Sequence, residues 1–122
     1  LSNLEEKQKE LEDMLKYDIL EIYDFKGIDD TSYKVKIKNN SQKNLGNIIL
    51  KVAEKNSDGE YISVSNISNN STLKAKDFSA LMLNSTDKEN TLEIIGYTYD
   101  DIENKSNIDI DLKTNTASIV RN

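Results

Sequence analysis

The chain has 122 residues, of which 36% are hydrophobic and 31% charged, and its formal net charge is −6. This length suits one domain with its own core, and the chain is too apolar to be disordered throughout. It contains no histidine and no cysteine, which excludes histidine-based catalysis, thiol chemistry, disulfides and the usual zinc ligands. We therefore expect a non-enzymatic protein, and the acidic charge disfavours nucleic acid as a partner.

Residues 2–16 predict an amphipathic helix. Ser2 and Glu5 form a capping-box pattern at its start. The apolar stripe consists of Leu4, Leu11, Met14 and Leu15. Two heptads are too few for a coiled coil, so the stripe either packs on the domain or continues an upstream stalk. We expect residues 1–16 to form a helix or stalk that is able to make oligomer contacts, and residues 17–122 to form the main domain.

From residue 17 the hydrophobic period changes from helical to two, which is typical of half-buried strands. A first strand is expected near residues 18–26. The next has the clearest alternation, with Tyr33, Val35 and Ile37 on one face and Lys34, Lys36 and Lys38 on the other. Lysines without interleaved aromatic residues indicate a solvated face. A third strand is marked by Ile48, Leu50 and Val52.

The second half of the domain repeats this pattern. Asn56-Ser57-Asp58-Gly59 predicts a hairpin turn, after which Ile62 and Val64 mark the return strand. Residues 66–77 read as a polar connection that holds the large apolar residue Leu73, and residues 78–83 as the next strand.

Two more alternating segments follow before the C-terminus. In the first, Leu92, Ile94 and Gly96 are expected on one face and Ile95, Tyr97 and Tyr99 on the other. In the second, Ile108, Ile110 and Leu112 alternate with Asp109 and Asp111, and residues 117–120 extend the sheet or add an edge. About seven strands, with turns every ~8–12 residues, predict an antiparallel β-sandwich.

The segment from Val35 to Ile48, with its Asn39-Asn40-Ser41 turn, resembles the opening of the FxLYD family. Leu50 to Gly59 is similar to that family's strand and Asp-Gly hairpin, and Leu73 to Phe78 to its later strand entry. The name-giving Leu-Tyr-Asp is replaced by Ala53-Glu54-Lys55. The resemblance covers roughly residues 30–83 and implies an immunoglobulin-like sandwich from a bacterial surface protein or lipoprotein, in a family without established catalytic residues.

Two sets of side chains are candidates for a site. Five carboxylates from adjoining segments could bind Ca²⁺, which prefers oxygen ligands, although a solvated acidic surface explains them as well. They are Asp100, Asp101, Glu103, Asp109 and Asp111. Tyr97 and Tyr99 share a strand face, where they either offer a contact surface for sugars or peptides or stabilise the sheet as an aromatic pair.

The sequence thus predicts a non-catalytic interaction or spacer module, extracellular and anchored at a bacterial cell surface. Its partner is a protein or another surface component, and it contacts the membrane only through an anchor outside these 122 residues. One alternative is a structural subunit of an envelope, secretion or transfer assembly that oligomerises through residues 2–16. Another is a carbohydrate-binding module that uses Tyr97. The lysine- and asparagine-rich composition favours an AT-rich bacterial source.

Overall fold

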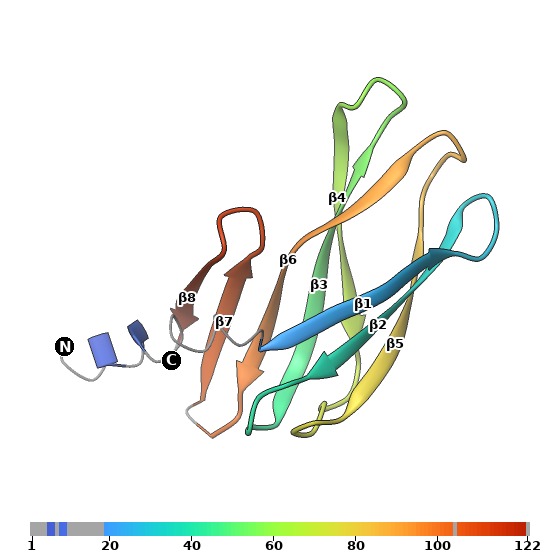
Figure 1. Ribbon diagram of the computed structural model, residues 1–122. Helices are drawn as coiled ribbons and strands as arrows, with labels where there is room; N and C mark the ends of the chain where they lie inside the picture. Colours follow the sequence, from blue (N-terminus) through green and yellow to red (C-terminus); the bar gives the residue numbers. More distant parts are fainter. Residues whose placement is uncertain (1–4, 7, 10–18, 104, 122) are drawn as a thin grey trace.

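The computed structural model describes residues 5–6, 8–9, 19–103 and 105–121, and in these ranges the chain forms eight β-strands (Figure 1). The strands are β1 (Leu20–Gly27), β2 (Ser32–Asn39), β3 (Leu45–Lys55), β4 (Tyr61–Asn69), β5 (Phe78–Asn84), β6 (Thr91–Asp101), β7 (Ser106–Asp111) and β8 (Thr116–Arg121). For residues 117–120 the sequence left two alternatives, an extension of the sheet or an added edge, and β8 is an added edge strand. The mostly-β prediction is confirmed.

The strands form two antiparallel sheets. The three-stranded sheet has the order β1-β2-β5, and the five-stranded sheet has the order β4-β3-β6-β7-β8. The chain crosses between the sheets after β2, after β4 and after β5, so neither sheet is continuous in sequence. The predicted hairpin joins β3 to β4, where Gly59 adopts a φ of 82° and the Asn56 side-chain oxygen accepts hydrogen bonds from the Asp58 and Glu60 amides.

The inward faces of both sheets supply one hydrophobic core. Alternation places Val35 and Ile37 of β2 and Leu50 of β3 at 0% exposure, as the sequence predicts. Leu73 is the buried residue of the connection between β4 and β5, and its backbone exchanges two hydrogen bonds with Leu45 at 2.8 and 2.9 Å. The remaining core residues are Ile19, Leu20, Leu45, Ile48, Val52, Leu81, Leu83, Tyr97, Tyr99, Ile108, Ile110 and Ala117.

A bulge in β6 reverses the predicted faces of its first residues. The pairing with β3 leaves one extra residue, Ile95, without a partner on β3. A bulge shifts the two-residue alternation by one position. Leu92 and Ile94 therefore pack against the same core as Tyr97 and Tyr99. The expectation that these two pairs lie on opposite faces is wrong, because periodicity alone does not reveal a bulge.

Strand β4 is longer and more exposed than the sequence suggested. It includes residues 66–69, which the sequence assigned to a connection. Ile62 and Val64 are 50% and 58% exposed and take no part in the core. Val64 pairs with Ala53, which alternates with the core residue Val52, so Val64 is directed to the outer face of the sheet.

Two buried polar side chains fix the connections between the sheets. The first is Asn39, which is 0% exposed at the end of β2. Its amide nitrogen donates hydrogen bonds to the carbonyl oxygens of Lys43 and Leu73, at 2.7 and 3.0 Å. Its side-chain oxygen accepts from the Ser41 amide and hydroxyl, at 2.9 and 2.7 Å. The predicted turn is thus built around a fully bonded buried amide.

The second is Glu54 of β3, which is 5% exposed. Its Oε2 atom accepts hydrogen bonds from the Thr86 amide, the Thr86 hydroxyl and the Asn90 side chain, at 3.0, 2.6 and 2.6 Å. Burial raises the pKa of this carboxyl, but these bonds together outweigh burial and leave the pKa below its ordinary value of 4.5. Glu54 thereby attaches the connection between β5 and β6 to β3.

The predicted helix over residues 2–16 lies largely outside the described residues. Of the four residues described there, Gln8 donates a hydrogen bond from its side chain to the Ala117 carbonyl oxygen on β8, at 2.6 Å. The helix and its oligomer contacts remain a prediction. In the part of the chain that the structure describes, no helix is long and apolar enough to cross a membrane.

Candidate functional site

Tyr97 and Tyr99 are buried and are not available as a contact surface. Both are 2% exposed, and their rings stack with centroids 6.2 Å apart. Burial raises the pKa of the Tyr99 hydroxyl, and the charges of Tyr97 and Asp101 raise it further. The alternative in which they stabilise the sheet is the one the structure bears out, and the hypothesis that needs the rings exposed is wrong. A sugar site at Tyr97 is excluded for the same reason.

The five candidate calcium ligands do not converge. Asp109 forms an ion pair with Lys51 at 3.0 Å, and one oxygen of Asp101 lies 3.4 Å from the Lys43 ammonium. The other three carboxylates are also held apart or exposed. Asp100 accepts a hydrogen bond from the Asn107 side chain, and Asp111 accepts from two backbone amides of the following turn. Glu103 is exposed. Within the described ranges, no group of three acidic residues is arranged to hold a metal ion. Shared strand faces and sequence proximity did not bring these oxygens together.

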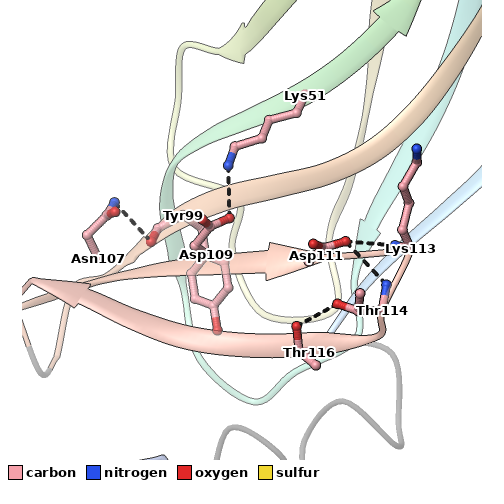
Figure 2. A network of polar contacts seen from close by, with 8 residues as sticks. All are labelled: Lys51, Tyr99, Asn107, Asp109, Asp111, Lys113, Thr114 and Thr116. Carbon is pink, nitrogen blue, oxygen red and sulfur yellow. Dashed lines mark hydrogen bonds and ion pairs between the residues drawn. The ribbon is translucent and has the colours of Figure 1, made fainter. Parts of the chain in front are cut away.

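A shallow depression of about 160 Å³ lies on the outer face of the five-stranded sheet, and Figure 2 shows the side chains of Lys51, Asp109 and Asp111, which line it. Gly96 is one of its lining residues, and an added Cβ there would lie 2.5 Å from the Ile110 carbonyl oxygen. Because β6 has no side chain there, Lys51 of β3 reaches across to Asp109 of β7. Asp111 is occupied by the turn that joins β7 to β8. The charges that line this depression are thus already paired, and it is best explained by strand packing.

The rest of this outer face is also internally paired. Lys55 forms an ion pair with Glu93 at 3.1 Å, and the Tyr61 hydroxyl donates to the same carboxylate at 3.2 Å. Two ammonium groups lie over the Tyr61 ring, those of Lys55 at 4.7 Å and Lys113 at 4.1 Å from the ring centroid. Such cation–π contacts hold the aromatic ring and both lysines in place. This face therefore has little charge left for a partner.

The outer face of the three-stranded sheet differs, because lysines and large apolar side chains are neighbours there. Lys34 and Lys38 of β2 point away from the core and pair across the strands with Met82 and Phe78 of β5. Phe78 is 67% exposed and Met82 is 52% exposed. We call Lys34, Lys36, Lys38, Phe78 and Met82 the lysine face. This face combines lysines that have no ion-pair partner among the described residues with exposed apolar side chains.

The charges of the lysine face are only partly compensated. Asp24 lies at a bulge in β1, at a φ of 52°, and its carboxylate is 3.1 Å from the Lys36 ammonium and 3.7 Å from that of Lys26. The hydrogen bond from Lys36 and the charge of Lys26 lower the pKa of Asp24. Lys34 and Lys38 have no ion pair with any described residue. At either end of the face, an unpaired lysine therefore adjoins an exposed apolar side chain.

Sequence reasoning found the lysines but missed their apolar neighbours. The alternation of β2 identified Lys34 and Lys38 as surface residues, and without aromatic residues nearby they read as a solvated face. Phe78 and Met82 lie about forty residues downstream and reach the lysines only through the pairing of β2 with β5. The available signal was in β5 itself, where Phe78, Ala80 and Met82 alternate with Ser79, Leu81 and Leu83, so that one of two apolar faces had to lie outward.

No protein-family model and no curated protein matches the chain. Among solved structures, 84% of the chain aligns with a segment of a Bacteroides uniformis β-glucuronidase 2 that is covalently bound to cyclophellitol-6-carboxylate aziridine. The sequence identity is 15%, the TM-score is 0.36, and the chain spans 12% of that enzyme. At this identity and TM-score, the likeness transfers no activity to the chain. The FxLYD resemblance over residues 30–83 stays a prediction.

Proposed function

We propose that the chain is a non-catalytic, immunoglobulin-like interaction module of a bacterial surface protein, and that it binds an anionic surface component through the lysine face. The observation that carries the proposal is the pairing of Lys34 with Met82 and of Lys38 with Phe78 on one exposed sheet face. These residues leave charge and apolar area exposed side by side in a chain whose net charge is −6.

The physical argument for binding combines two terms. Burial of exposed apolar area contributes about 25 cal/mol per Å², and a phenylalanine can bury roughly 150–250 Å². The two unpaired lysines lie four residues apart on one strand, roughly 13 Å along it, and so define two anion contacts of fixed spacing. The apolar term favours contact with any covering surface, whereas the lysines select an anionic one.

The remaining parts of the proposal have their own support. The order β1-β2-β5 opposite β3-β6-β7 corresponds to the A-B-E and C-F-G arrangement of immunoglobulin-like sandwiches, with β4 and β8 as additional edges. The bacterial and extracytoplasmic assignments are supported by the composition and by the resemblance over residues 30–83.

The proposal is tested by retention on an anionic cation-exchange matrix at pH 7 and low salt, followed by NMR titration with inorganic polyphosphate. A chain of this net charge is expected to flow through unless one face concentrates positive charge. We expect salt-dependent retention, with amide shifts centred on β2 and β5. The double variant Lys34→Gln with Lys38→Gln should lose retention, and Phe78→Ser with Met82→Ser should weaken it.

The matched control is Lys88→Gln with Lys105→Gln, which makes the same charge change at two exposed positions away from β2 and β5. The control should keep retention near that of the wild type. Equal losses in both double variants would show that overall charge, and not this face, governs binding. Flow-through of the wild type with no amide shifts would refute the proposal.

A further inference from the structure

Strand β4 is an edge strand without a single charged residue. It runs for nine residues at the margin of the five-stranded sheet and reads Tyr-Ile-Ser-Val-Ser-Asn-Ile-Ser-Asn. Residues 61–66 are all exposed, and Ile62 and Val64 leave 50% and 58% of their surface to solvent. Every second residue of an edge strand directs its N–H and C=O groups away from the sheet, where they are available to another strand.

The other three sheet edges differ from β4. Strand β1 carries Glu21, Asp24 and Lys26 and is interrupted by its bulge. On β8, the Ala117 carbonyl oxygen already accepts a hydrogen bond from Gln8. Strand β5 is uncharged but shorter, and it adjoins the lysines of β2, so pairing two copies there would bring like charges together. Charged residues and bulges are the usual protection of edge strands, and β4 has neither along residues 63–69.

We propose that β4 pairs with β4 of a second copy of this chain, in antiparallel orientation, and joins the two five-stranded sheets. In an antiparallel pair of identical strands about a twofold axis, only the residues near the axis lie next to their own copies, so a charge near the middle of β4 would face a like charge. An uncharged strand avoids this repulsion. The absence of charge along β4 is thus compatible with self-pairing and offers no ion pair to a charged partner strand.

The net charge of −6 gives the proposed dimer a diagnostic salt response. The two copies repel each other as whole molecules, and salt screens this repulsion over a Debye length of about 10 Å at 0.1 M. Hydrogen bonds and apolar contacts along β4 are little affected. Dimerisation should therefore strengthen as salt rises, whereas binding of anions to the lysine face should weaken. The two surfaces are distinguishable by this sign alone.

The test is sedimentation equilibrium of the intact chain over a range of protein and salt concentrations. One strand seam is a small interface, so we expect a weak dimer with a Kd on the order of 0.1–1 mM. The variant Val64→Lys introduces a charge at the seam and should weaken association at least tenfold, while Val64→Thr, which stays neutral and β-branched, should not. The matched control is Val120→Lys on β8, at a valine that is 61% exposed on the opposite edge.

Hydrogen exchange of the wild type provides a readout that does not depend on a variant. Amides of β4 should gain protection as the protein concentration rises, and amides of β1 should not. A measured mass equal to the monomer's 13.9 kDa at every protein and salt concentration would overturn the proposal. So would equal weakening by Val64→Lys and Val120→Lys, or concentration-dependent protection that appears in residues 2–16 and not in β4.

Discussion

Removal of the Glu54 carboxylate should destabilise the fold more than its position near a loop suggests. The variant Glu54→Ala removes the acceptor of three hydrogen bonds, from the Thr86 amide, the Thr86 hydroxyl and the Asn90 side chain. Asn90 is 8% exposed, so its side-chain nitrogen keeps only the long 3.5 Å contact with the Thr86 hydroxyl and has little access to water. An unsatisfied buried polar group costs about 1–3 kcal/mol. We therefore expect a loss of about 3 kcal/mol for Glu54→Ala.

The isosteric variant Glu54→Gln separates the charge from the hydrogen bonds. Its amide oxygen can still accept from Thr86 and Asn90, so only the charge-assisted part of each bond is lost, about 1 kcal/mol in total. The pKa of Glu54 is lowered by folding, so its contribution is fully present above its ordinary value of 4.5 and is lost as the pH falls through the lower folded value. The gap between the wild type and Glu54→Gln should therefore be largest near neutral pH and close under acidic conditions.

The assay is urea unfolding at several pH values, with thermal melts as a second measure at about 4 °C per kcal/mol for a chain of this size. The matched control is Glu89→Gln in the same connection, where the exposed side chain makes none of these bonds. Its effect should stay within about 0.5 kcal/mol. If Glu54→Gln were as stable as the wild type at pH 7, or if the gap widened towards acidic pH, the reasoning about this carboxylate would be refuted.

Two further predictions concern close packing and the buried amide. Gly96→Ala places a Cβ 2.5 Å from the Ile110 carbonyl oxygen and should cost about 2–3 kcal/mol of stability in thermal melts. In Gly46→Ala the nearest atoms belong to the movable side chain of Ile102, at 3.2 Å, so this variant should cost less than about 1 kcal/mol. Equal effects of the two would contradict the packing around β6. Asn39→Ala removes four hydrogen bonds at a fully buried site and should cost at least about 3 kcal/mol in urea unfolding, and a change below about 1 kcal/mol would show that these bonds do not hold the turn.

The sequence predicts those parts of the fold in which local chemistry and long-range packing agree. The alternation of β2 places Val35 and Ile37 in the core, and Asp58-Gly59 marks the turn between β3 and β4. The sequence also identifies Leu73 as a large apolar residue in a polar connection, and the structure buries it. In each case a few neighbouring residues contain the whole signal.

The errors arise where pairing partners decide the outcome. A single inserted residue, Ile95, turns Leu92 inward, and no periodicity within β6 announces it. The carboxylates near the C-terminus form separate contacts with partners that strand pairing brings close. One such partner is Lys51, which lies nearly sixty residues away from Asp109 in sequence. The lysine face likewise depends on the register between β2 and β5. Sequence reasoning can state that such side chains are exposed or charged, but the pairing of the strands determines what stands beside them.

The threading of the chain between the two sheets has a consequence for how the domain comes apart. Strand β5 lies in the three-stranded sheet while its neighbours in sequence, β4 and β6, belong to the other, so a break in either flanking connection still leaves both fragments with strands in the five-stranded sheet. A single proteolytic nick there does not release a layer. After such a nick, the two fragments remain joined through the pairing of β3 with β6.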